Sequence, residues 1–476
     1  MKEVHRAPEK RKATYPNFLG PIPRRIDTSW VLVVALSLGC GSSSAPPDAG
    51  LVTLDGGAAI DGGTVIDGGA LVDGGASIDA GTRDAGIADA GRDPGTPSTT
   101  YPAFTVDWPQ LTGSAAGVVA TPKFVAITYD GDALRTSVES FVSRIGTTAY
   151  WRATTAEYGV GAGTALTPIH LAESAPTALS DMDIQTFLAQ KLRADGGSAW
   201  PAPDGNTLYL LFYPAMTTIT TGGARSCFNF GAYHNAFRVG GVLVPYAVMP
   251  RCPGIARIPA LATELQTLTG VTAHEMAEAV TNVNPQEPLG YFLPPPRQMA
   301  FVTFAGAEVG DMCEFSDAAW ITDSELGATV QRSWSNAEAL AGREPCVPAG
   351  SGAYFVAVPV AQDDVPINFA GVDFITKGVA LRMGESKTLE LRLVSSGDTA
   401  GPFTVTAKDR RAFFGSPRVL TFAFDRSQGV NGEKLYVTVT RVGSDPDFGG
   451  AIPFAIIATK GNVKNYWFSV AGNPAP

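Results

Sequence analysis

The sequence is short of charge and of histidine. Charged residues make up 17% of its 476 residues, and only 4 histidines occur. The charge that is present is mainly negative, with a formal net charge of −10 and no stripe of Lys and Arg. Proteins that bind nucleic acid through its phosphates need clustered positive charge. We therefore expect no nucleic-acid partner.

No apolar run reaches the roughly 20 residues that a helix needs to cross a bilayer. The run at 30–39 (WVLVVALSLG) follows a polar, basic stretch and ends in small residues before Cys40. That layout is typical of a signal peptide, and it resembles a bacterial lipoprotein signal, in which the cysteine is lipidated. We predict a signal at 1–40, a membrane tether through Cys40, and export to the outer membrane or cell surface of a bacterium. The alternative is an ordinary secretory signal and a secreted chain.

Residues 41–100 are poor in large side chains. From about residue 45 the chain repeats six-residue units such as LDGGAA, IDGGTV and VDGGAS, which contain no aromatic residue. Hexapeptide repeats can form a β-helix, and Asp-Gly-Gly units can bind calcium. So little apolar surface does not offset the entropy of ordering the chain, however. We predict a disordered, acidic linker rich in Gly, Asp and Ala.

No C-x-x-C spacing occurs, which disfavours a zinc site made of cysteines. Besides Cys40, the chain has four cysteines, all between residues 227 and 346. An even number of cysteines in an exported protein indicates disulfides. Of the three connectivities we predict the sequential one, Cys227 with Cys252 and Cys313 with Cys346. Each bridge would stabilise the fold by roughly 3–4 kcal/mol in the chain-entropy model.

Strand-like and helix-like segments alternate over residues 101–350. Apolar residues at helical spacing predict a helix at 138–145, and Ser180 with Asp183 resembles a capping box ahead of another helix. Pro245 suggests that the strand around it lies at a sheet edge. The interleaving predicts an α/β (α+β) domain. The predicted strands are 124–129, 208–213, 242–249 and 301–304.

Residues 351–476 contain neither histidine nor cysteine. Apolar side chains alternate with period two at 389–393, 403–407 and 435–439, and turn-forming clusters separate these runs. Short strands at this spacing predict an all-β sandwich of the immunoglobulin-like kind. We assign no chemistry to this domain and expect a structural or adhesive role. Binding to a surface or a polysaccharide is the alternative.

The segment 259–282 carries the pattern with the clearest chemistry. Its apolar residues repeat at helical spacing, which leaves His274 and Glu278 together on the other face. An imidazole and a carboxylate one turn apart can hold one metal ion, and Glu275 beside them can activate a water molecule. This is the H-E-x-x-H pattern of zinc peptidases with Glu in place of the second His.

Two segments extend the pattern: AHEMAEAVTNVNP at 273–285 and GAEVGDMC at 306–313. Together they resemble a group of secreted bacterial proteins related to the plant EXORDIUM (phosphate-induced) family. The resemblance implies a zincin-like metallopeptidase domain at 101–350. The metal ligands that it implies are His274, Glu278 and a third carboxylate from Glu308 or Asp311, with Glu275 as the general base.

The donor set bears on the metal and on the third ligand. One His and two carboxylates bring a divalent ion to zero net charge, which makes it a weaker Lewis acid than the ion of a His₂Glu zinc site. We expect one divalent metal, zinc, with competition from manganese, iron or calcium. We prefer Asp311 as the third ligand, because a Cys313–Cys346 bridge would fix its backbone. Glu308 would instead orient a ligand.

The predicted activity is hydrolysis of peptide bonds by metal-activated water, with a peptide or protein substrate and Glu275 as the general base. His234 or Tyr233, on a Gly-rich loop, is expected to stabilise the oxyanion. The alternative is a non-catalytic binding or adhesion lipoprotein of the cell surface, whose zincin-like domain has lost its activity.

Overall fold

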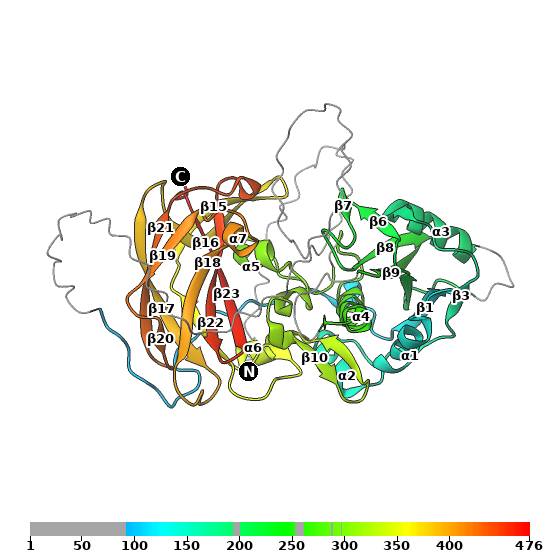
Figure 1. Cartoon of the computed structure of the whole chain (residues 1–476), viewed down its shortest axis with the longest axis horizontal. Coiled ribbons are helices and arrows are strands. Elements are labelled where there is room, and N and C mark those ends of the chain that lie inside the picture. Colours follow the sequence, from blue (N-terminus) through cyan, green and yellow to red (C-terminus); the bar gives the residue numbers. More distant parts are fainter. Residues whose placement is uncertain (1–91, 194–199, 253–260, 287–288, 297) are drawn as a thin grey trace, which may run out of the picture.

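The chain folds into an α/β body and a β-sandwich that lie side by side (Figure 1). The computed structural model describes residues 92–193, 200–252, 261–286, 289–296 and 298–476. The predicted signal at 1–40 with its Cys40, and the part of the predicted linker before residue 92, lie outside the described residues. Among the helices that the structure describes, none combines the length and the apolar character needed to cross a membrane.

A mixed six-stranded sheet forms the centre of the α/β body, with strand order β2-β1-β5-β9-β8 and β3 beside β1. β8 runs antiparallel to β9, and the other neighbours in this sheet are parallel. β1 and β5 are buried along nearly their whole length, as expected of strands with both faces covered. The bounds are β1 Lys123–Tyr129, β2 Thr164–Ala165, β3 Ile169–Leu171, β5 Thr207–Tyr213, β8 Tyr233–Val239 and β9 Val242–Pro250.

The predicted edge position of 242–249 is wrong, because β9 lies between β5 and β8. Pro245 lacks an N–H, but its only neighbour across the ladder is Ala236 of β8. The ladder between β9 and β5 begins one residue later, where Tyr246 lies opposite Tyr209. The proline therefore removes no hydrogen bond from the pairing with β5. β8 is the edge strand instead.

Three helices of the α/β body, α1, α3 and α4, form where the sequence places them. α1 buries the apolar residues that the helical spacing within 138–145 predicted. The capping box before α3 is also confirmed, since the Ser180 N–H donates to Asp183 Oδ2 at 2.8 Å and the Asp183 N–H donates to Ser180 Oγ at 3.2 Å. The helices are α1 Arg135–Ile145, α2 Ala149–Thr155, α3 Asp181–Arg193, α4 Glu264–Thr281, α5 Met299–Phe304 and α6 Asn336–Leu340.

Short elements surround these helices and the main sheet. A three-stranded sheet has the order β4-β6-β7, and the hairpins β10–β11 and β12–β13 are antiparallel. Their bounds are β4 Ala178–Ser180, β6 Thr218–Thr221, β7 Ala224–Arg225, β10 Trp320–Asp323, β11 Ala328–Gln331, β12 Ser333–Trp334 and β13 Cys346–Val347. The described 3₁₀ helices here are η1 Ala115–Gly117, η2 Ala156–Tyr158, η4 Asp311–Cys313 and η5 Asp317–Ala319, and η6 Pro446–Phe448 lies in the sandwich.

Helix α4 is held on two sides. A capping box starts it, in which Thr263 Oγ1 accepts from the Gln266 N–H at 3.2 Å and Gln266 Oε1 accepts from the Thr263 N–H at 3.0 Å. The helix then packs on β8 and β9 and, on another side, on β11. Gly270 permits close packing there, because a Cβ at this position would lie 3.0 Å from the Trp320 ring. Every residue from 267 to 281 is buried.

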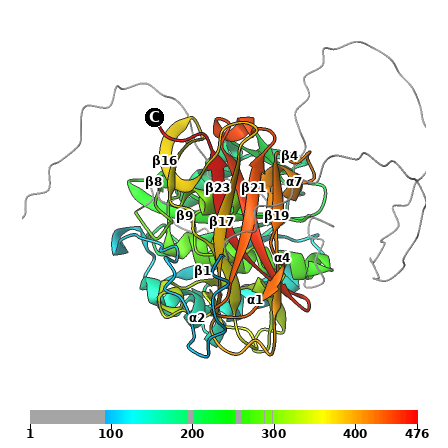
Figure 2. The same ribbon diagram turned by 90° about the vertical axis from the view of Figure 1, so that its left-hand side faces the viewer.

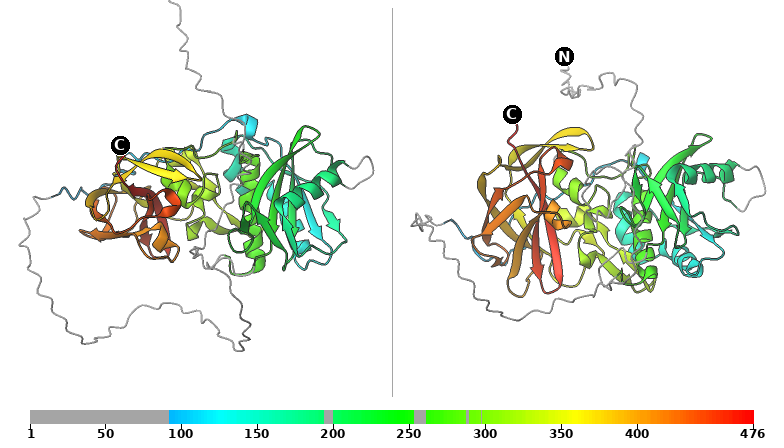
Figure 3. Two further views of the ribbon diagram at one scale, coloured as in Figure 1. Left: turned by 90° about the horizontal axis from the view of Figure 1, so that it is seen from above. Right: turned by 45° about the horizontal axis from the view of Figure 1, so that its top comes forward.

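The predicted strand at 301–304 is wrong, because these residues belong to helix α5. The four residues Phe-Val-Thr-Phe are too few to show a period, so they do not distinguish a strand from a helix. The Phe304 ring stacks on Phe468 with centroids 4.5 Å apart, and Phe301 meets Trp467 at 5.5 Å. We call this aromatic contact between α5 and the sandwich strand β23 the seam. Figure 3 shows α5 and the chain after it lying between the two bodies.

The sandwich consists of a four-stranded sheet, β14-β17-β21-β19, and a six-stranded sheet, β15-β16-β23-β22-β18-β20 (Figure 2). Alternate side chains of β17 and β21 are buried, which confirms the predicted all-β sandwich and its period. The short helix α7 is Arg410–Phe413. The strands are β14 Phe355–Pro359, β15 Asp363–Phe369, β16 Val372–Ala380, β17 Ser386–Ser395, β18 Phe403–Asp409, β19 Leu420–Phe424, β20 Gln428–Gly429, β21 Lys434–Arg441, β22 Ile452–Lys460 and β23 Val463–Gly472.

The last part of the predicted linker, residues 92–100, packs on the sandwich. Gly95 forms a β-bridge with Glu433, and the Ser98 N–H donates to the Asn431 carbonyl at 2.8 Å. The Asn431 side-chain amide donates in turn to the carbonyls of Ser98 and Thr100 at 2.9 and 2.8 Å. The linker boundary predicted at 100 is therefore too late. These partners lie more than 300 residues away in sequence, so local composition does not reveal them.

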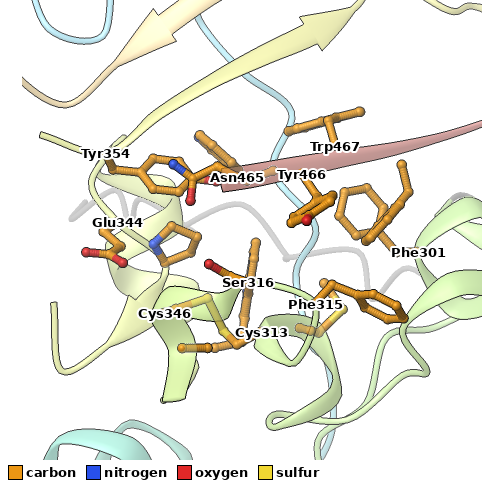
Figure 4. A pocket seen from close by; sticks show the side chains of 16 residues that line it. Phe301, Cys313, Phe315, Ser316, Glu344, Cys346, Tyr354, Asn465, Tyr466 and Trp467 are labelled. Carbon is orange, nitrogen blue, oxygen red and sulfur yellow. A yellow bond between two sulfur atoms is a disulfide. The ribbon is translucent and has the colours of Figure 1, made fainter. Parts of the chain in front are cut away.

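Both predicted disulfides are present, Cys227–Cys252 and Cys313–Cys346. The second joins η4 to β13 and borders a small pocket at the seam, where Figure 4 shows it beside aromatic side chains of both bodies. It ties down the chain immediately after Asp311.

Candidate metal centre

Helix α4 brings two potential ligands together, as its spacing predicted. His274 Nε2 lies 3.2 Å from Glu278 Oε2, one turn further along the helix. Both residues are buried, with exposed fractions of 4% and 0%. An unpaired carboxylate at such depth is costly, so this pair needs a further charge or a proton.

Asp311 completes a set of three. Its Oδ1 lies 3.7 Å from His274 Nε2, and it reaches the helix from the turn η4. One ligand atom from each of His274, Glu278 and Asp311 lies within 4.8 Å of the other two. The structure thus brings Asp311, the preferred third residue, beside the two helix residues.

Each of the two carboxylates has one oxygen bound by backbone amides and one oxygen left over. Glu278 Oε1 accepts from the N–H groups of Gly310 and Asp311, both at 3.0 Å. Asp311 Oδ2 accepts from the N–H groups of Ala307 and Glu308, at 2.8 and 3.1 Å. The second oxygens, Glu278 Oε2 and Asp311 Oδ1, are buried without a hydrogen-bond partner. These two oxygens are therefore available to a cation.

Gln331 fixes the ring of His274. The Gln331 amide nitrogen donates to the Gly310 carbonyl at 2.6 Å, and its oxygen lies 2.8 Å from His274 Nδ1. Because that oxygen only accepts, Nδ1 carries a proton, and in the neutral ring the lone pair of Nε2 then faces Glu278 and Asp311. Nε2 is itself buried and unpartnered. Three unpartnered donor atoms therefore converge, and they fit a divalent metal.

Glu308 occupies a different place. Its Oε1 accepts from the Asn282 side-chain amide at 2.7 Å and lies 3.5 Å from His234 Nε2. Its backbone N–H donates to Asp311. Glu308 therefore lies next to His274, Glu278 and Asp311 without belonging to their group of potential ligands.

His234 lies on the edge strand β8 and faces the helix, so the predicted Gly-rich loop around Tyr233 and His234 is wrong. Its Nδ1 is 3.2 Å from Glu275 Oε2 and 3.7 Å from Glu278 Oε2. Its neighbour Tyr233 points to the opposite face of the sheet, where its hydroxyl donates to Asp181 at 2.7 Å. Side chains alternate along a strand, so Tyr233 is removed from the site and only His234 remains there.

The cluster is short of positive charge. Burial lowers the pKa of His274, but the carboxylate of Glu278, followed by those of Glu275 and Asp311, outweighs it and raises this pKa well above its usual value. Burial and the Glu278 carboxylate raise the pKa of Asp311 well above its usual value. These shifts describe carboxylates that compete for protons, and a bound cation would relieve the competition.

Two residues at the site were missed by the sequence analysis. Gln331 lies in a short polar stretch whose letters do not suggest a ligand partner. Glu314 follows Cys313 and is 8% exposed, with one oxygen unpartnered. It lines a narrow opening with His274, Glu275 and Trp320. Only the fold shows that both side chains approach the helix.

Comparison with known proteins does not extend this description. No protein-family model and no curated protein matches the chain. Among solved structures, domains 4 and 5 of the S-layer protein SbsC align with 29% of this chain and 73% of theirs, at 17% identity and a TM-score of 0.15. The titin M3 domain aligns with 25% of this chain and 100% of its own, at 13% identity and a TM-score of 0.15. The sandwich assignment rests on its strand order.

Proposed function

We propose that the chain is a metal-dependent peptidase with a zincin-like α/β domain, in which His274, Glu278 and Asp311 hold one divalent cation. The observation that supports this is the convergence of three buried, unpartnered atoms, Nε2, Oε2 and Oδ1 of these residues. Zinc is the metal that we expect, although two carboxylates also suit manganese or iron.

The roles of the surrounding residues follow from their positions. A bound cation would polarise a substrate carbonyl and acidify a water molecule. Glu275 lines the opening and accepts the proton of that water. His234 Nδ1, 3.2 Å from the Glu275 carboxylate, orients that group. We propose this role instead of the predicted stabilisation of the oxyanion, because His234 Nδ1 faces the Glu275 carboxylate and not a space where a substrate oxygen would lie.

The test compares wild type with Glu275→Gln in the full chain. Both proteins should bind about one equivalent of zinc or more, because Glu275 is outside the proposed ligand set. Wild type should cleave casein. The variant should cleave it roughly 10²–10⁴-fold more slowly, because it lacks the proton acceptor. Wild type that binds no metal refutes the site, and equal cleavage by both proteins refutes the base.

A second candidate function is a non-catalytic surface protein that keeps the metal for stability. The observation that favours it is the depth of the site, since Glu278 and Asp311 are fully buried and their charge weakens the Lewis acidity of the ion. Wild type that holds metal and raises no cleavage of casein or of a peptide library would identify this function.

Attachment to a membrane is part of the same proposal. A lipid on Cys40 would tether an exported chain and bring the peptidase to substrates at the cell surface. Palmitate labelling of cells that express the chain tests this, and the label should disappear with Cys40→Ala. Equal labelling of the variant would leave the chain without this anchor.

A further inference from the structure

The carboxylate of Glu278 belongs to two groups of potential ligands. One is the set with His274 and Asp311. The other consists of His234, Glu275 and Glu278, whose ligand atoms also lie within 4.8 Å of one another. The two histidines fall in separate groups, so an ion bound to His274 is not the ion that His234 reaches.

The separations in the second group are close to those in the first, although here His234 Nδ1 and Glu275 Oε2 form a hydrogen bond that a bound ion would replace. His234 Nδ1 lies 3.2 Å from Glu275 Oε2 and 3.7 Å from Glu278 Oε2. In the first group the matching separations from His274 Nε2 are 3.2 and 3.7 Å. The side chains of His234, Glu275 and Glu278 are at most 3% exposed. Glu278 Oε2 has no hydrogen-bond partner and faces both groups.

The charge of the whole cluster favours more than one cation. Five buried carboxyl groups surround α4, those of Glu275, Glu278, Glu308, Asp311 and Glu314. In the described part of the chain, the ion-pair partners that these groups have are His234 and His274. If all five carboxyl groups are ionised and the histidines are neutral, one divalent ion compensates two of the five negative charges, and uncompensated buried charge is strongly unfavourable.

We propose a second divalent-cation position held by His234 Nδ1, Glu275 and Glu278, with the Glu278 carboxylate shared between the two ions. The inference rests on the metal centre of the proposed function. One nitrogen and two carboxylate donors suit zinc, cobalt or manganese. Because Glu275 is also the proposed proton acceptor, an ion in this second position removes the base, so a second equivalent of metal inhibits cleavage that the first supports.

Metal stoichiometry of the folded full chain tests the inference. Wild type equilibrated with excess zinc and freed of unbound ion should hold two equivalents. His234→Ala and Glu275→Gln should each hold one. His170→Ala is the matched control, because His170 is half-exposed on β3 and pairs with Glu139 away from the site, and it should hold two.

A spectroscopic readout covers the case in which a variant folds poorly. Wild type loaded with manganese(II) should give the electron paramagnetic resonance spectrum of a coupled pair, and His234→Gln that of an isolated ion. Wild type with one equivalent and an isolated-ion spectrum overturns the inference and identifies His234 as a protonated bridge between Glu275 and Glu308. Wild type with no metal at all overturns the proposed function instead.

Discussion

At the scale of single residues, each of the three side chains in the candidate centre uses one polar atom for a hydrogen bond and leaves the other without one. One oxygen of Glu278 and one of Asp311 bind backbone amides, and one nitrogen of His274 binds Gln331. The other atom of each side chain is thereby aimed and left free. Residues that hydrogen-bond to a metal ligand and orient it commonly have a large effect on metal affinity, although they do not touch the metal.

Gln331→Ala should therefore weaken zinc binding by roughly 10–100-fold, although Gln331 does not belong to the proposed ligand set. Without the Gln331 side-chain amide, the His274 ring loses the hydrogen bond that fixes its tautomer and orientation. Competition with a chromogenic chelator measures the affinity. Gln428→Ala, an exposed position on β20, should bind as wild type does, and equal affinity of both variants would contradict the role of Gln331.

The same affinity assay should distinguish Asp311 from Glu308 as the third metal ligand. Asp311→Asn should lose most of the zinc affinity, because the oxygen aimed at His274 no longer carries charge. Glu308→Gln should lose much less, since Glu308 does not share a ligand group with His274. The reverse order of the two variants would make Glu308 the ligand.

The pH dependence of stability should change sign when metal binds. Burial raises the pKa of Glu314 to about 8, so in the metal-free fold this group holds a proton that the unfolded chain has already released. The free energy of unfolding of the metal-free chain should therefore fall as pH rises from about 5 to 8. The raised pKa of His274 acts in the same direction, because its stabilisation is lost as pH rises through the folded pKa.

Metal-loaded protein should do the opposite. Carboxylate ligands and a neutral histidine bind metal only after they lose their protons, so the stabilisation by zinc should grow as pH rises. Urea unfolding at several pH values, with and without zinc, measures both slopes. Parallel slopes in the two states would show that these side chains do not bind the ion.

At the scale of elements, the periodic segments were predictable and the short ones were not. α1 and the strands β17 and β21 follow patterns that their own residues repeat. The strand predicted at 301–304 was wrong because four residues are too few to show a period. The edge position predicted from Pro245 was wrong because β9 pairs with β5 only from Tyr246 onward. This register between strands far apart in the sequence is not visible in the residues around Pro245.

In the candidate site too, some residues were predictable from the sequence and others were not. His274, Glu275 and Glu278 lie on one helix, so their spacing is legible in sequence. Asp311 was preferred from its neighbouring disulfide, and the structure brings it to the helix. Gln331 and Glu314 approach through contacts of β11 and of the chain after η4. No local pattern records those contacts.

The disulfide after the ligand turn should matter for metal binding as well as for stability. Replacing Cys313 and Cys346 with Ser should lower the stability by about 2–4 kcal/mol and weaken zinc binding, because the η4 turn holds Asp311. Replacing Cys227 and Cys252 should lower stability by a similar amount and change the zinc affinity less. Calorimetry and chelator competition separate the two effects, and equal zinc affinity of both double variants would contradict the link between η4 and the metal.

At the scale of the whole molecule, the α/β body and the sandwich share a core. The aromatic side chains of α5 pack directly on β23 at the seam. The chain from α5 leads within a few residues to the turn that carries Asp311. The sandwich is therefore a structural support of the candidate centre, although it contributes no ligand to it.

A chain that ends before the sandwich should consequently fail to form a stable α/β body. The exposed rings of Phe301 and Phe304 would leave an apolar patch that favours aggregation. The full chain should unfold in one transition for both bodies, followed by near-ultraviolet circular dichroism and by calorimetry. In the full chain, Phe468→Ala should cost about 3–5 kcal/mol. Two separate transitions, or a soluble, zinc-binding fragment 101–350, would contradict the dependence.

The clasp that Asn431 forms around Ser98 and Thr100 has a consequence for orientation. It fastens the beginning of the described chain to the sandwich, on the side away from α4 (Figure 1). If Cys40 carries a lipid, the tether therefore joins the described chain at the sandwich, and the α/β body with the candidate centre lies on the far side of that attachment point.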